Sequence, residues 1–181
     1  MEFSELIKLR QSVRRYAERP VEDEKLQQLV EAVRLAPSAS NSQPWTLIMV
    51  TEPELKGRVA EATYSKLVSF NKFVPQAPVM AVLVLEKPKM ITQLGAALKG
   101  REFPLIDIGV AASHFCLQAA ELGLGTCMLG WFDEKKVRKL LAIPKNKRIG
   151  LLITLGYAID GYRTRPKIRK ETEEMSRYNS Y

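Results

Sequence analysis

The sequence predicts one domain built as a helix–sheet–helix sandwich, with helices on both faces of a single sheet. The chain has 181 residues, of which 46% are hydrophobic and 27% charged, as is typical of one domain with a sizeable core. Segments with helical periodicity alternate with short apolar, partly β-branched runs that are typical of strands. The predicted helices are numerous enough to cover both faces of one sheet.

The clearest helix signal lies between two prolines. Pro20 to Glu24 opens this helix and Pro37 stops it, and its acids lie at the N-terminal end, where the helix dipole favours them. The apolar residues that recur at helical spacing are Leu26, Leu29, Val30 and Val33. Further helices are expected at residues 3–9, from Pro53 to about residue 70, and from Asp133 to about residue 141.

A long apolar segment predicts the central helix. Asp107 is expected to cap a helix that runs to about Leu122 and is apolar on nearly all faces, which indicates burial on most sides. We expect it at the centre of the fold or of a dimer, and Gly123–Gly125 ends it. The strands are expected at residues 45–51, 78–85, 126–129 and 150–157. Residues 86–103 show no clear pattern.

Several protein classes are disfavoured by composition. No run approaches the ~18 to 20 apolar residues of a membrane helix, and the N-terminal residues lack the pattern of a secretory signal. We therefore expect a cytoplasmic protein without membrane contact. Cys116 and Cys127 lack the spacing of a metal site or disulfide framework and are expected to be reduced. His114, the single histidine, is interpreted as structural, which disfavours metal-hydrolase and Ser-His-Asp chemistry.

The formal charge of +8 is concentrated in the C-terminal third. Residues 1–34 contain seven Lys or Arg and seven Asp or Glu, whereas residues 135–170 contain twelve Lys or Arg and one acid, Asp160. Such an excess suits a nucleic acid, a phosphorylated cofactor or an anionic substrate, and it also serves solubility. Charge alone does not choose between these interpretations.

The first of three polar segments covers residues 10–14. Arg10, Ser12 and Arg14 alternate, so an extended backbone would project all three side chains from one face. Guanidinium groups pair with phosphate oxygens, and a hydroxyl adds a donor. The pattern therefore suits a phosphate, although a solvated basic loop has the same composition.

Two other polar segments complete the pattern. Residues 37–45 place hydroxyls and amides between two prolines, an arrangement that suits a heterocycle with mixed hydrogen-bonding edges but also an ordinary turn. Residues 163–170 are strongly basic and suit a phosphate site or a mobile tail. The chain contains neither a GxGxxG nor a GxxxxGK[ST] string, so a nucleotide would have to be held by side chains.

The order of these segments resembles the FMN-dependent nitroreductase family across nearly the whole chain. The resemblance rests on Arg10-Gln11-Ser12-Val13-Arg14, on Ala36 to Trp45 (APSASNSQPW), on Asp107-Ile108-Gly109 before Leu122 to Gly125 (LGLG), and on Leu155-Gly156-Tyr157. The combination of the Arg-x-Ser-x-Arg string with the Pro-Ser-x-x-Asn-x-Gln-Pro-Trp string is specific, and either alone is weak.

The resemblance implies a role for individual residues. Those implied to hold the FMN phosphate and ribityl chain are Arg10, Ser12, Lys167 and Arg169, with Gln11 also counted as cofactor-binding. Arg14 would reach the N1/O2 edge of the ring. Those implied to frame the ring, or to approach it from a second subunit, are Pro37, Ser38, Ala39, Asn41 and Gln43. Leu129 and Gly130 would lie near N5, with the Gly130 N–H as donor, and Asn71 would contact the pyrimidine.

The same resemblance implies an α+β fold with a mostly antiparallel mixed sheet, in a single domain over residues 1–181. It implies a homodimer in which residues 161–181 form an arm over the partner. The flavin would carry the chemistry, so no catalytic side chain and no metal are expected. Electrons would pass from NADH or NADPH to a nitroaromatic, quinone or related acceptor by a ping-pong mechanism.

Two departures and two alternatives accompany this interpretation. Ala39 replaces a serine common in the family, and Leu129 replaces an acidic residue found in many relatives, which bears on acceptor range.

Flavin fragmentation, reductive dehalogenation or flavin storage are alternatives on the same scaffold. A basic nucleic-acid-binding module is the alternative from another class; the chain has no RNP-like aromatic run, zinc pattern or helix-turn-helix pattern.

Overall fold

A four-stranded antiparallel sheet forms the centre of the molecule in a computed structural model that describes residues 1–65, 69–88 and 100–181. Its spatial order is β1-β2-β4-β3. The strands are β1 (Trp45–Val50), β2 (Val79–Leu85), β3 (Gly125–Leu129) and β4 (Arg148–Gly156). The α-helices are α1 (Phe3–Leu9), α2 (Asp23–Arg34), α3 (Pro53–Glu61), α5 (Phe103–Glu121), α6 (Glu134–Leu140) and α7 (Thr172–Met175).

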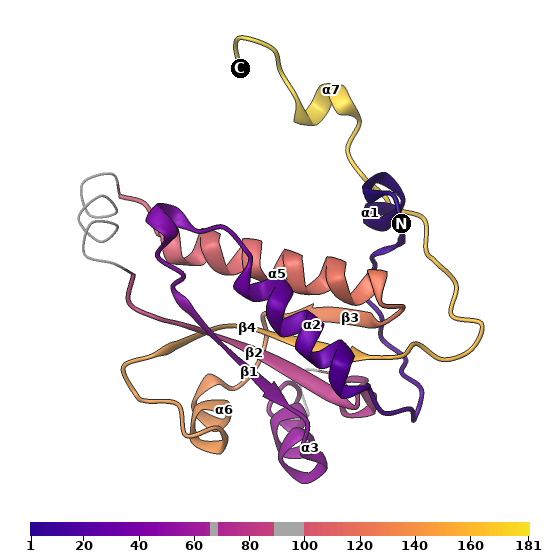
Figure 1. The fold of residues 1–181 in the computed structure, drawn as a ribbon, viewed down its shortest axis with the longest axis vertical. Helices are drawn as coiled ribbons and strands as arrows, with labels where there is room; N and C mark the ends of the chain where they lie inside the picture. Colours follow the sequence, from indigo (N-terminus) through magenta and orange to yellow (C-terminus); the bar gives the residue numbers. More distant parts are fainter. Residues whose placement is uncertain (66–68, 89–99) are drawn as a thin grey trace.

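Helices cover both faces of this sheet, with α2 and α5 on one side and α3 and α6 on the other (Figure 1). The central strand β2 explains the arrangement, because successive side chains of a strand point to opposite faces. Its residues 79, 81 and 83 pack with α2 and α5, whereas residues 80, 82 and 84 pack with α3 and α6. A strand buried on both sides reads as a continuous apolar run, as this one does.

The sheet differs slightly from the mixed sheet that was expected. Within the described residues, all pairings between the four strands are antiparallel. A parallel component appears only as an isolated bridge between Ser12 and Thr126, outside the named strands. The α+β class and the covering of both faces agree with the sequence prediction.

Two predicted helix boundaries were wrong. Helix α3 ends at Glu61 and not near residue 70, because the chain turns at Ala62, and the Thr63 hydroxyl donates a hydrogen bond to the Ala60 carbonyl. Part of the predicted extension, residues 66–68, lies outside the described residues. Helix α5 begins at Phe103, with Pro104 in its first turn, so Asp107 lies inside the helix and does not cap it.

Helix α5 is the core helix of the fold. Its length and composition would suit a membrane span, but much of its surface is covered by α2 and the sheet. Its buried residues are Asp107, Ile108, Ala111, Ala112, Phe115, Cys116, Ala119 and Ala120. The small residues among them allow α2 and the sheet to approach closely, as the sequence predicted.

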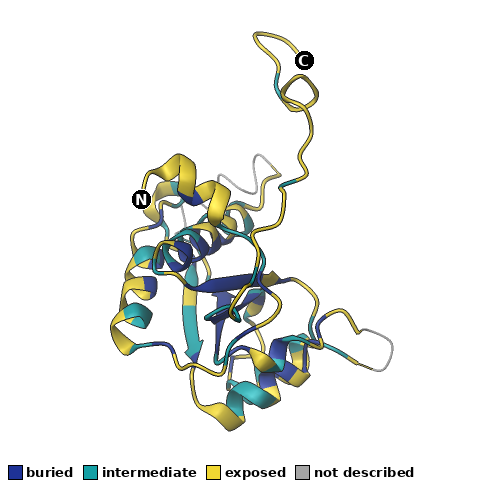
Figure 2. Ribbon diagram, turned by 90° about the vertical axis from the view of Figure 1, so that its right-hand side faces the viewer, coloured by how far each residue is buried: buried dark blue, intermediate teal, exposed yellow. Residues whose placement is uncertain are grey.

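The C-terminal segment leaves the body of the molecule. After β4 the chain runs past α1 and then extends outward through α7, and almost all of it is exposed (Figure 2). Ile168 and Tyr178 are 90% and 88% exposed. Exposed apolar side chains on an extended segment are typical of a segment that packs against another surface.

Replacing Phe115 tests the assignment of α5 to the core. Phe115 is fully buried, so Phe115→Ala should lower the free energy of unfolding by about 3–5 kcal/mol through lost burial and a residual cavity. Urea unfolding would measure this, with the exposed Ser113→Ala on the same helix as the control. A loss for Phe115→Ala no larger than that of the control would contradict the assignment.

Candidate functional site

The first polar segment lies along the free edge of β3. The Val13 N–H donates to the Thr126 carbonyl at 2.8 Å, and Ser12 forms the parallel bridge with Thr126. A Cβ atom at Gly125 would come within 2.6 Å of Val13, so glycine permits this approach. Ser12 and Val13 are therefore held beside β3 like a short neighbouring strand, which is the condition under which Arg10, Ser12 and Arg14 were expected to share one face.

The basic C-terminal segment lies against the same residues. The Gln11 side chain donates to the Arg163 carbonyl at 3.4 Å and accepts from the Arg165 N–H at 3.1 Å. The Lys167 ammonium donates to the Arg10 carbonyl at 2.5 Å. Two segments more than 150 residues apart in sequence thus form one surface, as the predicted phosphate site requires.

This surface has a strongly positive electrostatic environment. Desolvation, followed by the charges of Arg10 and Arg169, lowers the pKa of Lys167 from its ordinary value. In the described parts of the chain, no ion pair involves Arg10, Arg14, Lys167 or Arg169. Like charges gathered without a carboxylate raise the free energy of the empty surface, and an anion would relieve that repulsion.

A small cavity lies beside this cationic surface. It has a volume of about 170 Å³ and is lined by residues 9–11 and Val13, by the end of α5, by residues 123–126, and by Ala158, Tyr162 and Thr164. Arg10 and Gln11 line it together with Tyr162, whose hydroxyl accepts from the Arg14 N–H at 3.1 Å. Backbone, guanidinium and hydroxyl groups therefore meet at one end of α5.

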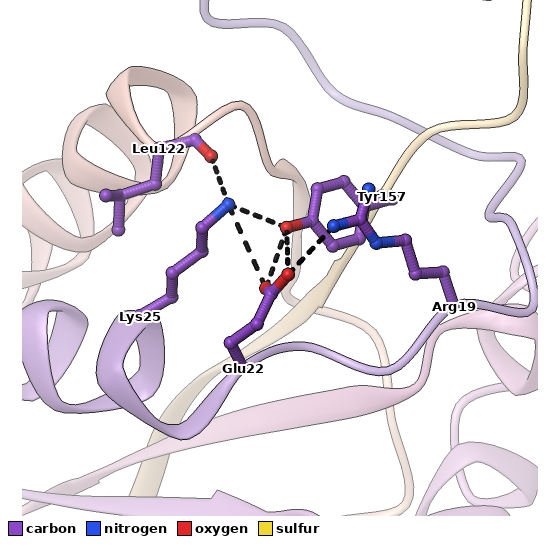
Figure 3. A network of polar contacts seen from close by, with 5 residues as sticks. All are labelled: Arg19, Glu22, Lys25, Leu122 and Tyr157. Atoms are coloured by element: carbon purple, nitrogen blue, oxygen red, sulfur yellow. Dashed lines mark hydrogen bonds and ion pairs between the residues drawn. The ribbon is translucent and has the colours of Figure 1, made fainter.

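A polar network fixes that end of α5 (Figure 3). Lys25 donates to the Leu122 carbonyl at 3.0 Å and to the Tyr157 hydroxyl at 2.6 Å, and that hydroxyl donates to Glu22. The guanidinium of Arg19 lies 3.9 Å from the centre of the Tyr157 ring. The network joins α2, the end of α5 and the residue after β4, so it positions the start of the C-terminal segment.

The second polar segment adopts an unusual backbone. Ser40, Asn41 and Gln43 have φ angles of 52°, 49° and 47°, in the left-handed region that costs L-residues free energy. Hydrogen bonds hold this shape: the Ser38 hydroxyl accepts from the Gln43 N–H at 2.8 Å, and the Gln43 amide donates to Asn41 Oδ1 at 3.0 Å. The loop presents fixed polar groups, as the sequence predicted.

Within one chain, this loop lies far from the cationic surface. The Ala39 N–H donates to Asp107 Oδ1 at 3.1 Å, which attaches the loop near the start of α5. The cavity lies at the other end of α5, beside Ala120. Thirteen residues of helix separate Asp107 from Ala120, or about 20 Å at 1.5 Å per residue. One chain therefore brings the first and third polar segments together but does not add the second.

Comparison with known proteins identifies the family. Residues 7–157 match the model of the nitroreductase family. The chain belongs to this family. This nitroreductase is 31% identical to a nitroreductase family protein of Clostridium novyi whose structure covers 88% of this chain and 87% of its own, with a TM-score of 0.76.

Two further relatives agree. An FMN-dependent nitroreductase of Clostridium difficile is 25% identical, covers 97% of this chain and 98% of its own, and has a TM-score of 0.79. An FMN reductase [NAD(P)H] of Bacillus subtilis is 30% identical over 176 residues, which cover 88% of this chain and 67% of the relative. The nitroreductase is an NAD(P)H-dependent flavin oxidoreductase, and the resemblance inferred from the sequence strings is confirmed.

The remaining predicted site residues lie around the end of β3. Leu129 is buried at the last position of the strand, and Gly130 follows it and is exposed. Asn71 is buried, and its amide nitrogen donates to the Thr63 and Trp131 carbonyls at 3.0 and 3.2 Å. Its donors thus hold the chain around Gly130, and a contact with the pyrimidine stays a prediction.

Sequence reasoning missed several residues of this nitroreductase. Phe70 and Trp131 are 62% and 59% exposed and meet edge to face, with ring centres 6.4 Å apart. Tyr16 is buried, and its hydroxyl lies 2.9 Å from the Val13 carbonyl and 2.6 Å from Thr154, which fixes the end of the first polar segment.

Burial raises the pKa of the Cys116 thiol to about 11, and both cysteines are free.

The network around Glu22 predicts a dependence of stability on pH. The hydrogen bond from Tyr157, assisted by Arg19 and Lys25, lowers the pKa of Glu22 from 4.5 to about 2. Because the pKa of Glu22 is lower in the folded state than in the unfolded state, its carboxylate stabilises the protein at pH values above the unfolded-state pKa. This contribution disappears as the pH falls through about 2.

Glu22→Gln should therefore lower the urea midpoint at pH 7, and the difference from wild type should shrink below pH 4.5. Urea titrations over the pH range in which the protein stays folded would measure it. Because Glu22 is exposed, only the direction is predicted. The exposed Glu24→Gln on the same helix is the control, and a difference that is constant with pH would argue against the network.

Proposed function

We propose that this nitroreductase binds FMN between two copies of the chain and passes electrons from NADH or NADPH to a nitroaromatic, a quinone or a related acceptor. The observation that supports a shared site is the separation of about 20 Å between the cavity beside Arg10 and the loop attached to Asp107. Both polar segments have cofactor-binding chemistry, and a second copy supplies the loop that one chain keeps at a distance.

The cationic surface fits the FMN phosphate. Arg10, Lys167 and Arg169 supply positive charge, and Ser12 and Gln11 supply polar groups beside them. Guanidinium and ammonium groups form charge-assisted hydrogen bonds with phosphate oxygens. Desolvation, followed by the charges of Arg10 and Arg169, lowers the pKa of Lys167, and an anion bound here would offset the repulsion from those two charges.

In this proposal the cofactor extends along the edge of β3. The Thr126 carbonyl accepts a hydrogen bond from the Val13 N–H, so it points away from β4. Backbone N–H and C=O groups with this orientation recur at every second residue of the strand. The N–H of Gly130 follows in this series, about 13 Å along the strand from Thr126. A ring that lies along this edge would have the Gly130 N–H near N5 and Arg14 near N1 and O2.

Arg14 and Gly130 supply the local electrostatics of this site. When bound, FMN supplies the hydride and electron transfer. The exposed Arg14 guanidinium would place positive charge where the reduced ring carries negative charge, and the Gly130 N–H would donate at the opposite edge. No side chain has to transfer a proton or form a covalent bond in this proposal, which agrees with the absence of a predicted catalytic residue.

The second copy would contribute two segments. Pro37, Ser38, Ala39, Asn41 and Gln43 would frame the ring, since the left-handed loop presents their polar groups in fixed positions. Residues 161–181 would form an arm over the partner, which would cover exposed side chains such as Ile168 and Tyr178. Burial of those side chains contributes roughly 25 cal/mol per Å² of apolar surface.

Arg10→Ala should weaken FMN binding about 10- to 100-fold, because it removes a charge-assisted hydrogen bond to phosphate. Fluorescence titration of the apoprotein with FMN would measure the Kd. Arg15→Ala is the matched control, since it removes the same charge from an exposed neighbour on the other face of the segment. Equal affinity of wild type and Arg10→Ala would mean that the phosphate lies elsewhere.

Steady-state kinetics test the proposed sequence of binding. With one pocket used in turn by donor and acceptor, double-reciprocal plots at several acceptor concentrations should give parallel lines. NADPH added without oxygen should bleach the flavin absorbance before any acceptor is present. Lines that converge would show that donor and acceptor are bound together, and the shared-pocket proposal would then be wrong.

A further inference from the structure

Asp107 is a buried acid with an incomplete set of partners. It lies in the second turn of α5 and is 5% exposed, next to the apolar residues that α5 contributes to the core. Its Oδ1 accepts from the Ala39 N–H at 3.1 Å, whereas its buried Oδ2 has no hydrogen-bond partner among the described residues. A buried carboxylate that uses only part of its acceptor capacity costs free energy, so it requires an explanation.

The usual structural roles of an acid near a helix start do not apply to Asp107. Helix α5 begins at Phe103, so Asp107 lies beyond the N-cap position and the first turn. It forms no ion pair within the described parts of the chain. Its one hydrogen bond goes to a different segment, the loop at residues 38–43.

Contacts with the rest of the protein are needed to hold the loop in position. Three of its residues have φ near +50°, a conformation that costs free energy when the residue is not glycine. The bonds between Ser38, Asn41 and Gln43 are internal, so they set the shape of the loop but not its place on the protein. The bond from Ala39 to Asp107 connects the loop to the core helix.

We propose that Asp107 is a positioning residue that fixes the loop at residues 38–43 against α5, and thereby sets the wall that faces the flavin ring of the partner's site. This inference rests on the proposed function. The hydrogen bond between Asp107 and the Ala39 N–H links the loop to a buried helix and so helps to hold the donors and acceptors of Ser38, Asn41 and Gln43 in one place. The phosphate end of the site does not depend on this bond.

The test compares two variants at Asp107 with a matched control. Asp107→Ala removes the acceptor, and Asp107→Asn keeps an oxygen that can accept from Ala39. Asp133→Ala is the control, since the Asp133 carboxylate likewise accepts one backbone N–H, that of Lys136 at 3.0 Å, at the start of α6. For each protein, thermal stability, the Kd for FMN, the flavin absorbance spectrum, and kcat and KM for a quinone would be measured.

Asp107→Ala should lower kcat/KM for the quinone roughly tenfold and alter the flavin spectrum, while the Kd for FMN changes by less than about threefold. Asp107→Asn should retain kcat/KM within about threefold. Asp133→Ala should lose stability but keep the activity and the spectrum. A loss of activity in Asp107→Ala that only follows its loss of stability, as in the control, would overturn the inference.

A further variant keeps the test decisive if Asp107→Ala does not fold. Ala39→Pro removes the N–H donor, and the loop can accept proline because Ala39 is the first residue of its short helical turn and Ser38 has the extended angles φ −148° and ψ 158°. It should show the same spectral change and roughly tenfold loss. A wild-type spectrum and kcat/KM would contradict the role of this bond. A wild-type protein that binds no flavin would instead refute the proposed function.

Discussion

The burial of helix α5 is the constraint on which the rest of the structure depends. The helix is packed between α2 and the sheet, so its position and length cannot vary independently of the core. Its first turns carry the loop at residues 38–43, and its last turn meets the cationic surface. The distance between the two polar segments is therefore a consequence of core packing.

The same packing explains why cationic side chains gather beside the free edge of β3. The free edge of β3 accepts residues 12 and 13 as neighbours, and the C-terminal segment then lies on the outer side of those residues. The network of Glu22, Lys25 and Tyr157 determines where that C-terminal segment starts. Cations from both ends of the chain therefore converge, although neither segment has a glycine-rich phosphate loop. In the proposed site, side chains would take the place of the backbone cradle that such a loop provides.

The sequence predicted those features of the fold that local chemistry determines. The apolar run of β2 and the periodicity of α2 predicted both elements and their burial. Tertiary contacts determined what was missed. Helix α3 ends early because of a turn beside Thr63, and Asp107 lies inside α5 because Pro104 starts the helix earlier. Local patterns do not contain such information.

The candidate site was predictable in composition but not in arrangement. The two donor-rich strings indicated candidate residues, whose binding roles stay predictions. The left-handed angles of Ser40, Asn41 and Gln43 and the bond from Ala39 to Asp107 depend on residues distant in sequence. Likewise, the meeting of Phe70 with Trp131 joins two segments that show no common pattern. Only the three-dimensional structure shows that the first and second polar segments lie at opposite ends of α5 within one chain.

Complementation between two impaired variants, assayed at an FMN concentration well below the Kd of Arg10→Ala, tests the shared site most directly. Arg10→Ala would disable the phosphate end, and Ser38→Ala combined with Asn41→Ala would disable the loop. Refolded together, they should regain about a quarter of wild-type activity, because about half of the dimers are hybrids and each hybrid has one intact site. If both halves of a site came from the same chain, no hybrid would have an intact site, and the mixture would stay as inactive as its components.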